Sequence, residues 1–281
     1  MPLDQIGDVE EEGEMSFLDH LEQLRWHLIR ALIAVAVLTI VALIFPKILF
    51  QEIIFAPSKA EFWTFEMFCN LGQYVGVDSF CIDELNFDLQ SRKVEGQFMM
   101  YITASFFAGF IVAFPYVVWE IWRFIKPGLY SNEKKATRGA VFYVSSLFIL
   151  GISFGYFIIS PISVYFFSSF TIDPSIKNDF DIVSYVSTII TIVLGSGILF
   201  QLPMAILFLS KAGIVTPALL RNYRRHAIVI ILVIGALITP PDPFSQIFVA
   251  LPLFTLYEVG ILISMRIHKR KLAKETALAQ Q

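Results

Sequence analysis

The sequence predicts an all-α integral membrane protein with six transmembrane helices, and three observations support this fold class. The chain of 281 residues is 56% hydrophobic and 16% charged, whereas soluble proteins contain about 45–50% apolar and about 25% charged residues. Apolar stretches long enough to cross about 30 Å of hydrocarbon recur along it. Lysines and arginines collect in alternate connecting segments, as they do in membrane proteins. The net charge of −3 gives no indication of a nucleic-acid partner.

The N-terminal segment, residues 1–15, is acidic and precedes a predicted amphipathic helix. It lacks the basic region and cleavage site of a secretory signal peptide, so we expect nothing to be removed from it. The motif SFLD at residues 16–19 has the pattern of a capping box, which predicts that a helix begins there. Asp19, Glu22 and Gln23 share one face of this helix, because residues three and four apart are neighbours. We interpret it as an interfacial helix that continues into the first span.

Six apolar stretches follow and are interpreted as spans. They cover approximately residues 26–46, 98–125, 139–170, 182–210, 227–238 and 244–265. The third is long enough to require tilt or a bend at Pro161, and Pro203 interrupts the fourth. Pro240, Pro241 and Pro243 separate the fifth from the sixth, because they end a helix and favour a tight turn. The fifth span is short and covers only about 18 Å as a helix.

The basic residues test this count independently. Sixteen of the 21 lysines and arginines fall on one predicted side of the membrane: two near the start of span one (Arg25 and Arg30), five around the loop between spans two and three, four around the loop between spans four and five, and five at the C-terminal end. Since the retained side of a membrane protein collects basic residues in its short loops, both termini are predicted to be cytoplasmic. The expected organisation is an acidic N-terminus at 1–15, a membrane domain at 16–267 and a basic cytoplasmic tail at 268–281.

The first outward loop, approximately residues 47–97, holds both cysteines of the chain, Cys69 and Cys81. The predicted topology places this loop in an oxidising compartment, where disulfides form and persist. We therefore predict a Cys69–Cys81 disulfide and a partly ordered loop.

Several short motifs are distributed along the chain. They are HLEQLR at 20–25, FAP at 55–57, WRFIKPGLY at 122–130 followed by EKK at 133–135, FQLP at 200–203, TPPDPFSQ at 239–246 and YEVG at 257–260. Together, and in this order, they resemble the signature motifs of the TatC family, the receptor components of twin-arginine protein translocases. One of these motifs alone would carry little information, whereas the whole series is specific.

The resemblance implies a glove-like arrangement of six helices that binds signal peptides carrying two consecutive arginines. It also implies transport of folded proteins by the proton-motive force, without a cofactor and without catalysis. The implied partners are single-span subunits like TatA and TatB, further copies of the chain within a translocase complex, and membrane lipid. The implied location is the bacterial inner membrane.

The residues implied in signal binding are Gln23 and Arg25 of the first motif, with Phe124 and Glu133 of the loop after the second span. The family usually has a glutamate where this chain has Gln23. A neutral amide cannot supply the charged, bidentate acceptor that a guanidinium favours.

Asp19, one helical turn before Gln23, or its neighbour Glu22 could replace the missing charge. We expect Glu133 and the Asp19/Glu22 pair to form an acidic patch at the cytoplasmic surface. The alternative is that these acids form an ordinary solvated helix face, as charged faces usually do.

Six further residues are candidates with competing interpretations. Pro57 and Gln246 belong to motifs of the family, and Asp173 lies near the position of its membrane-facing acid. Asp242 is expected to cap the sixth helix. For Glu258, inside span six, a function and an interior hydrogen bond are both open. Glu120 is expected to extend toward the membrane surface or to pair with Arg123 rather than to be functional.

The sequence lacks the motifs and residue combinations that the enzyme classes considered would require. Neither a zinc-binding HExxH motif nor a phosphate-binding GxxxxGK[ST] motif occurs. The segment LGSG at 194–197 has no intramembrane histidine to activate Ser196, so we interpret it as small residues that pack helices. The alternative function is a proton- or ion-coupled transporter of a small solute, with Glu258 and Glu120 as ion sites. Such a transporter would be favoured by broken helices in corresponding halves, and none is visible.

Overall fold

The computed structural model describes residues 17–76, 81, 82, 85, 87–125, 139–173, 175–238 and 243–279. The side chains of residues 17–21, 75, 238, 243–245, 274, 275 and 277–279 lie outside that description. In chain order the elements are α1 Phe17–Ile44, the π-helix η1 Ile48–Ile54, the 3-10 helix η2 Ala56–Ser58, α2 Trp63–Val75, β1 Leu89–Gln90, α3 Gly96–Ile125, α5 Ala140–Phe154, the π-helix η5 Gly155–Ile159, α6 Ser160–Ser169, β2 Phe180–Asp181, α7 Ile182–Leu199, α8 Leu202–Lys211, α9 Pro217–Asn222, α10 Arg224–Ile238 and α11 Pro243–Ala279.

The predicted spans correspond in order to the helical segments of the structure. Among the described residues, five segments are long and apolar enough to cross a membrane: Glu22–Ile44, Gly96–Ile125, Ala140–Ser169, Ile182–Lys211 and Gln246–Ala273. The fifth predicted span is α10, whose 15 residues cover only about 22 Å. Helix α11 continues to Ala279, so the described part of the tail is helical.

Prolines alter the spans at both predicted positions. The span that contains Pro161 changes from α5 through the π-helix η5 into α6, with Pro161 in the first turn of α6. The next span divides between Leu199 and Leu202, with Pro203 in the first turn of α8. Proline lacks the N–H that would continue the ladder, and its ring clashes with the preceding turn. The interruption at Pro203 is therefore confirmed, whereas at Pro161 the helix changes its hydrogen-bond pattern and continues.

Small residues allow close approach where the spans pack. A Cβ added at Gly109 would lie 2.5 Å from the backbone nitrogen of Thr39, so only glycine fits where α3 crosses α1. A Cβ at Gly151 would lie 2.6 Å from the carbonyl oxygen of Ser196 in α7. These contacts confirm that the LGSG segment packs helices.

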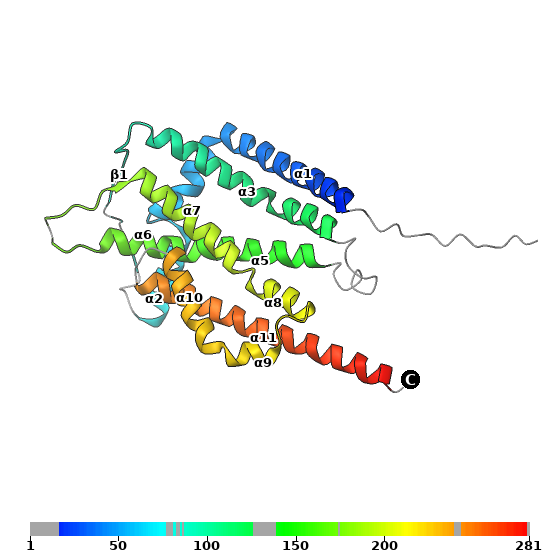
Figure 1. Cartoon of the computed structure of the whole chain (residues 1–281). Coiled ribbons are helices and arrows are strands. Elements are labelled where there is room, and N and C mark those ends of the chain that lie inside the picture. Colours follow the sequence, from blue (N-terminus) through cyan, green and yellow to red (C-terminus); the bar gives the residue numbers. More distant parts are fainter. Residues whose placement is uncertain are drawn as a thin grey trace, which may run out of the picture.

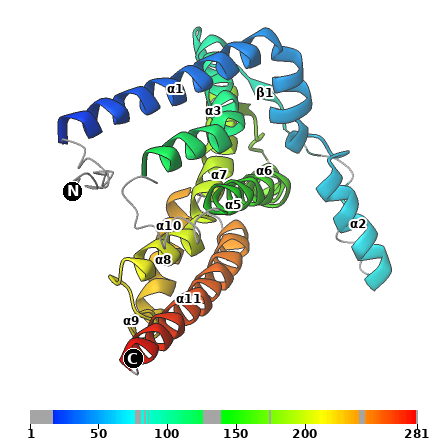
Figure 2. The same cartoon turned by 90° about the vertical axis from the view of Figure 1, so that its right-hand side faces the viewer.

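The helices form an open wall rather than a closed bundle (Figures 1 and 2), with α1 at one edge and α11 at the other. Helix α1 packs along α3, α5 packs on α7, and α8 and α10 pack on α11, while α3 and α7 join the two halves. The first residues of α1, the last of α3, the first of α5 and the last of α11 lie at one end of the molecule. This arrangement agrees with basic segments that share one side of a membrane.

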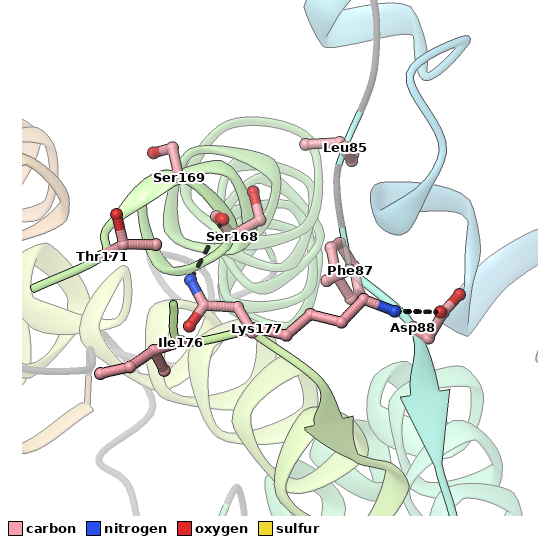
Figure 3. A pocket seen from close by; sticks show the side chains of 9 residues that line it. Leu85, Phe87, Asp88, Ser168, Ser169, Thr171, Ile176 and Lys177 are labelled. Carbon is pink, nitrogen blue, oxygen red and sulfur yellow. Dashed lines mark hydrogen bonds and ion pairs between the residues drawn. The ribbon is translucent and has the colours of Figure 1, made fainter. Parts of the chain in front are cut away.

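At the opposite end, two loops are joined by a short parallel sheet that the sequence analysis did not predict. Leu89 pairs with Phe180 and Gln90 pairs with Asp181, so the loop before α3 is held against the loop before α7. A cavity of about 530 Å³ lies beside this sheet (Figure 3), crossed by the ion pair of Lys177 Nζ and Asp88 Oδ2 at 3.3 Å. Asn178 donates hydrogen bonds to the last carbonyls of α6.

Candidate functional site

A buried carboxylate links α1 to α3 near the end of the molecule where α1 begins. Glu120 is only 1% exposed. Its Oε2 shares a 2.5 Å hydrogen bond with Nδ1 of His27 in α1, and its Oε1 accepts a 3.0 Å hydrogen bond from the Tyr116 hydroxyl. Arg123 Nη1 lies 3.7 Å from Oε1. Both carboxylate oxygens therefore have partners, as a buried acid requires.

The sequence offered two expectations for Glu120, extension toward the membrane surface and a pair with Arg123. The structure contradicts the first, and for the second it adds His27 and Tyr116 as partners. The local pair with Arg123 is present, and the Arg123 guanidinium also lies 4.7 Å from the centre of the Trp119 ring. Extension of Glu120 toward the membrane surface is wrong, because its side chain is buried between two helices. Sequence reasoning missed His27, whose place in the site depends on how α1 packs against α3.

The same helix faces bring together two residues of the predicted signal-binding set. Gln23 lies one turn before His27 in α1, and Phe124 lies one turn after Glu120 in α3. Since α1 and α3 run in opposite directions side by side, both turns lead to the same end of the helix pair. The ring centres of His27 and Phe124 are 6.3 Å apart. Phe124 is half-buried and Gln23 is exposed.

The remaining residues of that set are only partly described. Glu22 and Arg25 are exposed on α1. Asp19 lies in the first turns of α1, but its side chain falls outside the described residues, and Glu133 lies outside them altogether. The predicted acidic patch therefore stays a prediction, and the described part of it is the exposed end of the α1–α3 pair.

A second polar cluster lies where α10 packs on α11. Arg224 Nη2 is 2.6 Å from Glu258 Oε2, and the neighbouring Tyr257 hydroxyl donates to the Leu220 carbonyl at 2.9 Å. The Gln246 amide donates to the Leu232 carbonyl at 3.3 Å. Glu258 therefore sits in an ion pair between helices, which sequence reasoning did not identify because Arg224 is 34 residues away.

The other candidates occupy separate places. Asp173 is exposed, and its Oδ1 accepts hydrogen bonds from the Ser175 hydroxyl and backbone amide, which lower the pKa of its carboxyl. Pro57 is buried in η2, Cys69 and Cys81 form a disulfide, and Asp242 lies outside the described residues. Within the described part of the chain, no three His, Cys, Asp or Glu side chains are grouped to hold a metal ion.

Comparisons with known proteins agree on one family. A family model described as Sec-independent protein translocase protein (TatC) matches residues 19–252. The Sec-independent protein translocase protein TatC of Blattabacterium sp. subsp. Periplaneta americana (strain BPLAN) is 40% identical over 93% of this chain and 99% of its own. The protein of the same name from Helicobacter pylori (strain J99 / ATCC 700824) is 40% identical over 64% of this chain and 72% of its own.

Solved structures give the same result. A crystal structure of the twin-arginine translocase receptor TatC matches with a TM-score of 0.64 at 30% identity, covering 89% of this chain and 99% of the other. A second structure of that receptor, in DDM, matches with a TM-score of 0.67 at 32% identity, covering 87% of this chain and 99% of the other. The likeness confirms the predicted all-α membrane fold.

Proposed function

The chain belongs to the TatC family, the receptor component of the twin-arginine translocase, and we propose that the exposed end of its α1–α3 pair recognises the signal peptide. The observation that carries this proposal is the placement of Gln23 and Phe124 at the same end of two linked helices. Both occupy positions that the family motifs associate with signal recognition. The geometry therefore supports one binding surface rather than two separate motifs.

Charge complementarity must come from the acids around this end. Gln23 offers a neutral amide, whereas a guanidinium is bound best by a carboxylate in a two-point geometry. Glu120 is nearby in the same helix pair, but His27 and Tyr116 already occupy its oxygens. We therefore assign recognition of the two arginines to Glu133, supported by Asp19 and Glu22. A fully exposed ion pair contributes only about 0–1 kcal/mol, so selectivity requires that the bound signal excludes part of the water.

The wider proposal follows from the family. The chain acts in the bacterial inner membrane with both termini in the cytoplasm, alongside single-span subunits like TatA and TatB and further copies of itself. It moves folded proteins by the proton-motive force. A solute transporter receives less support, because both acids that would serve as its ion sites, Glu120 and Glu258, are paired with basic side chains.

Photo-crosslinking tests the recognition site. A photoreactive residue in place of Gln23 or Phe124 leaves the carboxylates of Glu133, Asp19 and Glu22 intact. It should capture a twin-arginine signal peptide and should capture the twin-lysine version less efficiently, because lysine cannot form the forked contact. The matched control is the same residue in place of Tyr74, which is 92% exposed and belongs to α2, Trp63–Val75, at the other end of the molecule (Figure 1).

Equal capture of both signals at the α1–α3 end, or equal capture at Tyr74, would contradict this site. Export of a twin-arginine reporter by cells that carry each crosslinking variant should be measured in parallel. Loss of capture with normal export would remove the site from the proposal and leave the family function in place.

A further inference from the structure

The helix α2, Trp63–Val75, lies in the predicted outward loop but carries an exposed apolar stripe. Trp63, Met67, Leu71 and Tyr74 follow one another at spacings of four, four and three residues, so they share one face of the helix. Trp63 is 57% exposed, Leu71 is 54% exposed and Tyr74 is 92% exposed. Such a face would be costly in water, which indicates that something covers it.

The other two faces of α2 have clear roles. Thr64, Phe65 and Gly72 are buried toward the protein, while Glu66, Asn70 and Gln73 form an exposed polar face. The Cys69–Cys81 disulfide lies at the border of these two faces, away from the apolar stripe. A helix with one face on protein, one polar face and one exposed apolar face containing Trp and Tyr is typical of a membrane interface.

The first turn of α2 is attached to a residue deep within a membrane span. The Thr64 hydroxyl donates a hydrogen bond to the carbonyl of Phe157. This carbonyl is the one that Pro161, four residues later, cannot serve because it has no N–H. An unpaired carbonyl in hydrocarbon is costly, and the Thr64 hydroxyl supplies a donor where Pro161 has none.

The position of Phe157 sets the depth of α2. Phe157 lies twelve residues before Ser169, the outer end of a 30-residue span, or about 18 Å along the helix. Such a span is about 45 Å long and exceeds the hydrocarbon by about 7 Å at each end when centred. Phe157 is then about 10 Å inside the hydrocarbon. The Trp63 ring contacts the Phe157 ring edge to face at 5.9 Å, so Trp63 reaches lipid depth.

The views of the whole molecule agree with this depth. In Figure 1, α2 lies level with α6 rather than beyond its outer end. Figure 2, seen from the end where α1 begins, shows α2 extending sideways away from α6. We propose that α2 is embedded in the outer leaflet of the bilayer, with the Trp63–Tyr74 stripe in contact with lipid. This inference rests on the membrane fold and does not depend on signal recognition.

Quenching by lipid tests the stripe in the reconstituted full-length chain. In a variant whose other three tryptophans, Trp26, Trp119 and Trp122, are replaced by Phe, Trp63 is the single fluorophore. Two further variants carry Trp63→Phe with either Leu71→Trp on the stripe or Gln73→Trp on the polar face, which points well away from the stripe. Each is placed in phosphatidylcholine vesicles with and without brominated acyl chains, and iodide serves as the aqueous quencher.

Brominated lipid should quench Trp63 and the tryptophan at position 71 several-fold more than the one at position 73, and iodide should give the reverse order. Equal quenching at positions 71 and 73 would overturn the proposal. So would protection of the stripe positions from both quenchers, because that result would mean that a second copy of the chain covers α2. Trp63 is native, so its result stands even if a position-71 variant folds poorly.

Discussion

At the scale of single residues, Glu120 shows how a buried acid is tolerated within a helix pair. Its carboxylate accepts contacts from His27, Tyr116 and Arg123, which come from two helices. Removal of one partner from such a group leaves the other buried and unpaired, at a cost of about 3–5 kcal/mol. The contact therefore holds α1 and α3 in a fixed register just below the proposed recognition surface.

We expect Glu120→Ala to lower the thermal stability of the purified chain strongly, because His27 and Tyr116 lose their shared acceptor. Glu22→Ala removes an exposed acid from the same end and should change stability by no more than about 0.5 kcal/mol. Thermal unfolding in one detergent measures both variants. The double variant His27→Ala/Glu120→Ala should lose less than the sum of the single losses, because the two residues interact directly. Equal effects of Glu120→Ala and Glu22→Ala would contradict this role.

At the scale of elements, the outward loop is held in place by contacts with spans that lie far from it in the sequence. The π-helix η5 presents Phe157 and Tyr156, whose rings pack on Phe62 just before α2. The Tyr156 and Tyr185 hydroxyls donate to the carbonyls of Ile53 and Ile54 at the end of η1. The loop is therefore fastened to two spans, and the Cys69–Cys81 disulfide closes it on itself.

The disulfide should stabilise α2 locally and leave the spans largely unaffected. Closing a short loop of this kind contributes about 3 kcal/mol by restricting the unfolded chain. Reduction of membranes with dithiothreitol should therefore speed proteolytic cleavage between residues 60 and 95, and a Cys69→Ser/Cys81→Ser variant should be cleaved at that faster rate without reductant. The reductant should have no further effect on the variant. Mass spectrometry that finds both thiols free in unreduced membranes would reject the disulfide.

At the scale of the whole molecule, the open wall leaves two different edges. The edge at α1 is a full-length span, whereas α10 at the other edge has 15 residues and covers only about 22 Å. A span shorter than the hydrocarbon thins the bilayer around it. The α10–α11 edge is therefore expected to perturb the membrane locally, at the edge of the wall opposite α1.

The proposed orientation can be tested by labelling with a membrane-impermeant maleimide. In a Cys69→Ser/Cys81→Ser background, Asp88→Cys should react in intact cells, because Asp88 lies at the outer end beside β1. Glu133→Cys and Lys269→Cys should react only after lysis, since their segments belong to the basic, retained side. Labelling of Glu133→Cys or Lys269→Cys in intact cells would contradict the topology and the proposed function together.

Features of the fold were predictable from the sequence wherever a residue within the segment itself causes them. Pro203 lies where its span divides because a proline cannot continue a hydrogen-bond ladder, and both cysteines lie in a loop on the side that is predicted to be oxidising. The β1–β2 pairing was not predictable, since two residues per strand carry no periodic pattern. The ion pair of Arg224 and Glu258 was missed for the same reason as the His27 contact, because their separation along the chain hides it.

The sequence by itself determined that the chain lies in a membrane, how many times it crosses and which family it belongs to, because apolar length, proline and basic charge act locally. Only the tertiary structure decided which polar groups meet: Glu120 with His27, Glu258 with Arg224, and Thr64 with the carbonyl of Phe157. The physical reason is that a buried polar group must find its partner in space. That partner is supplied by whichever helix packs beside it.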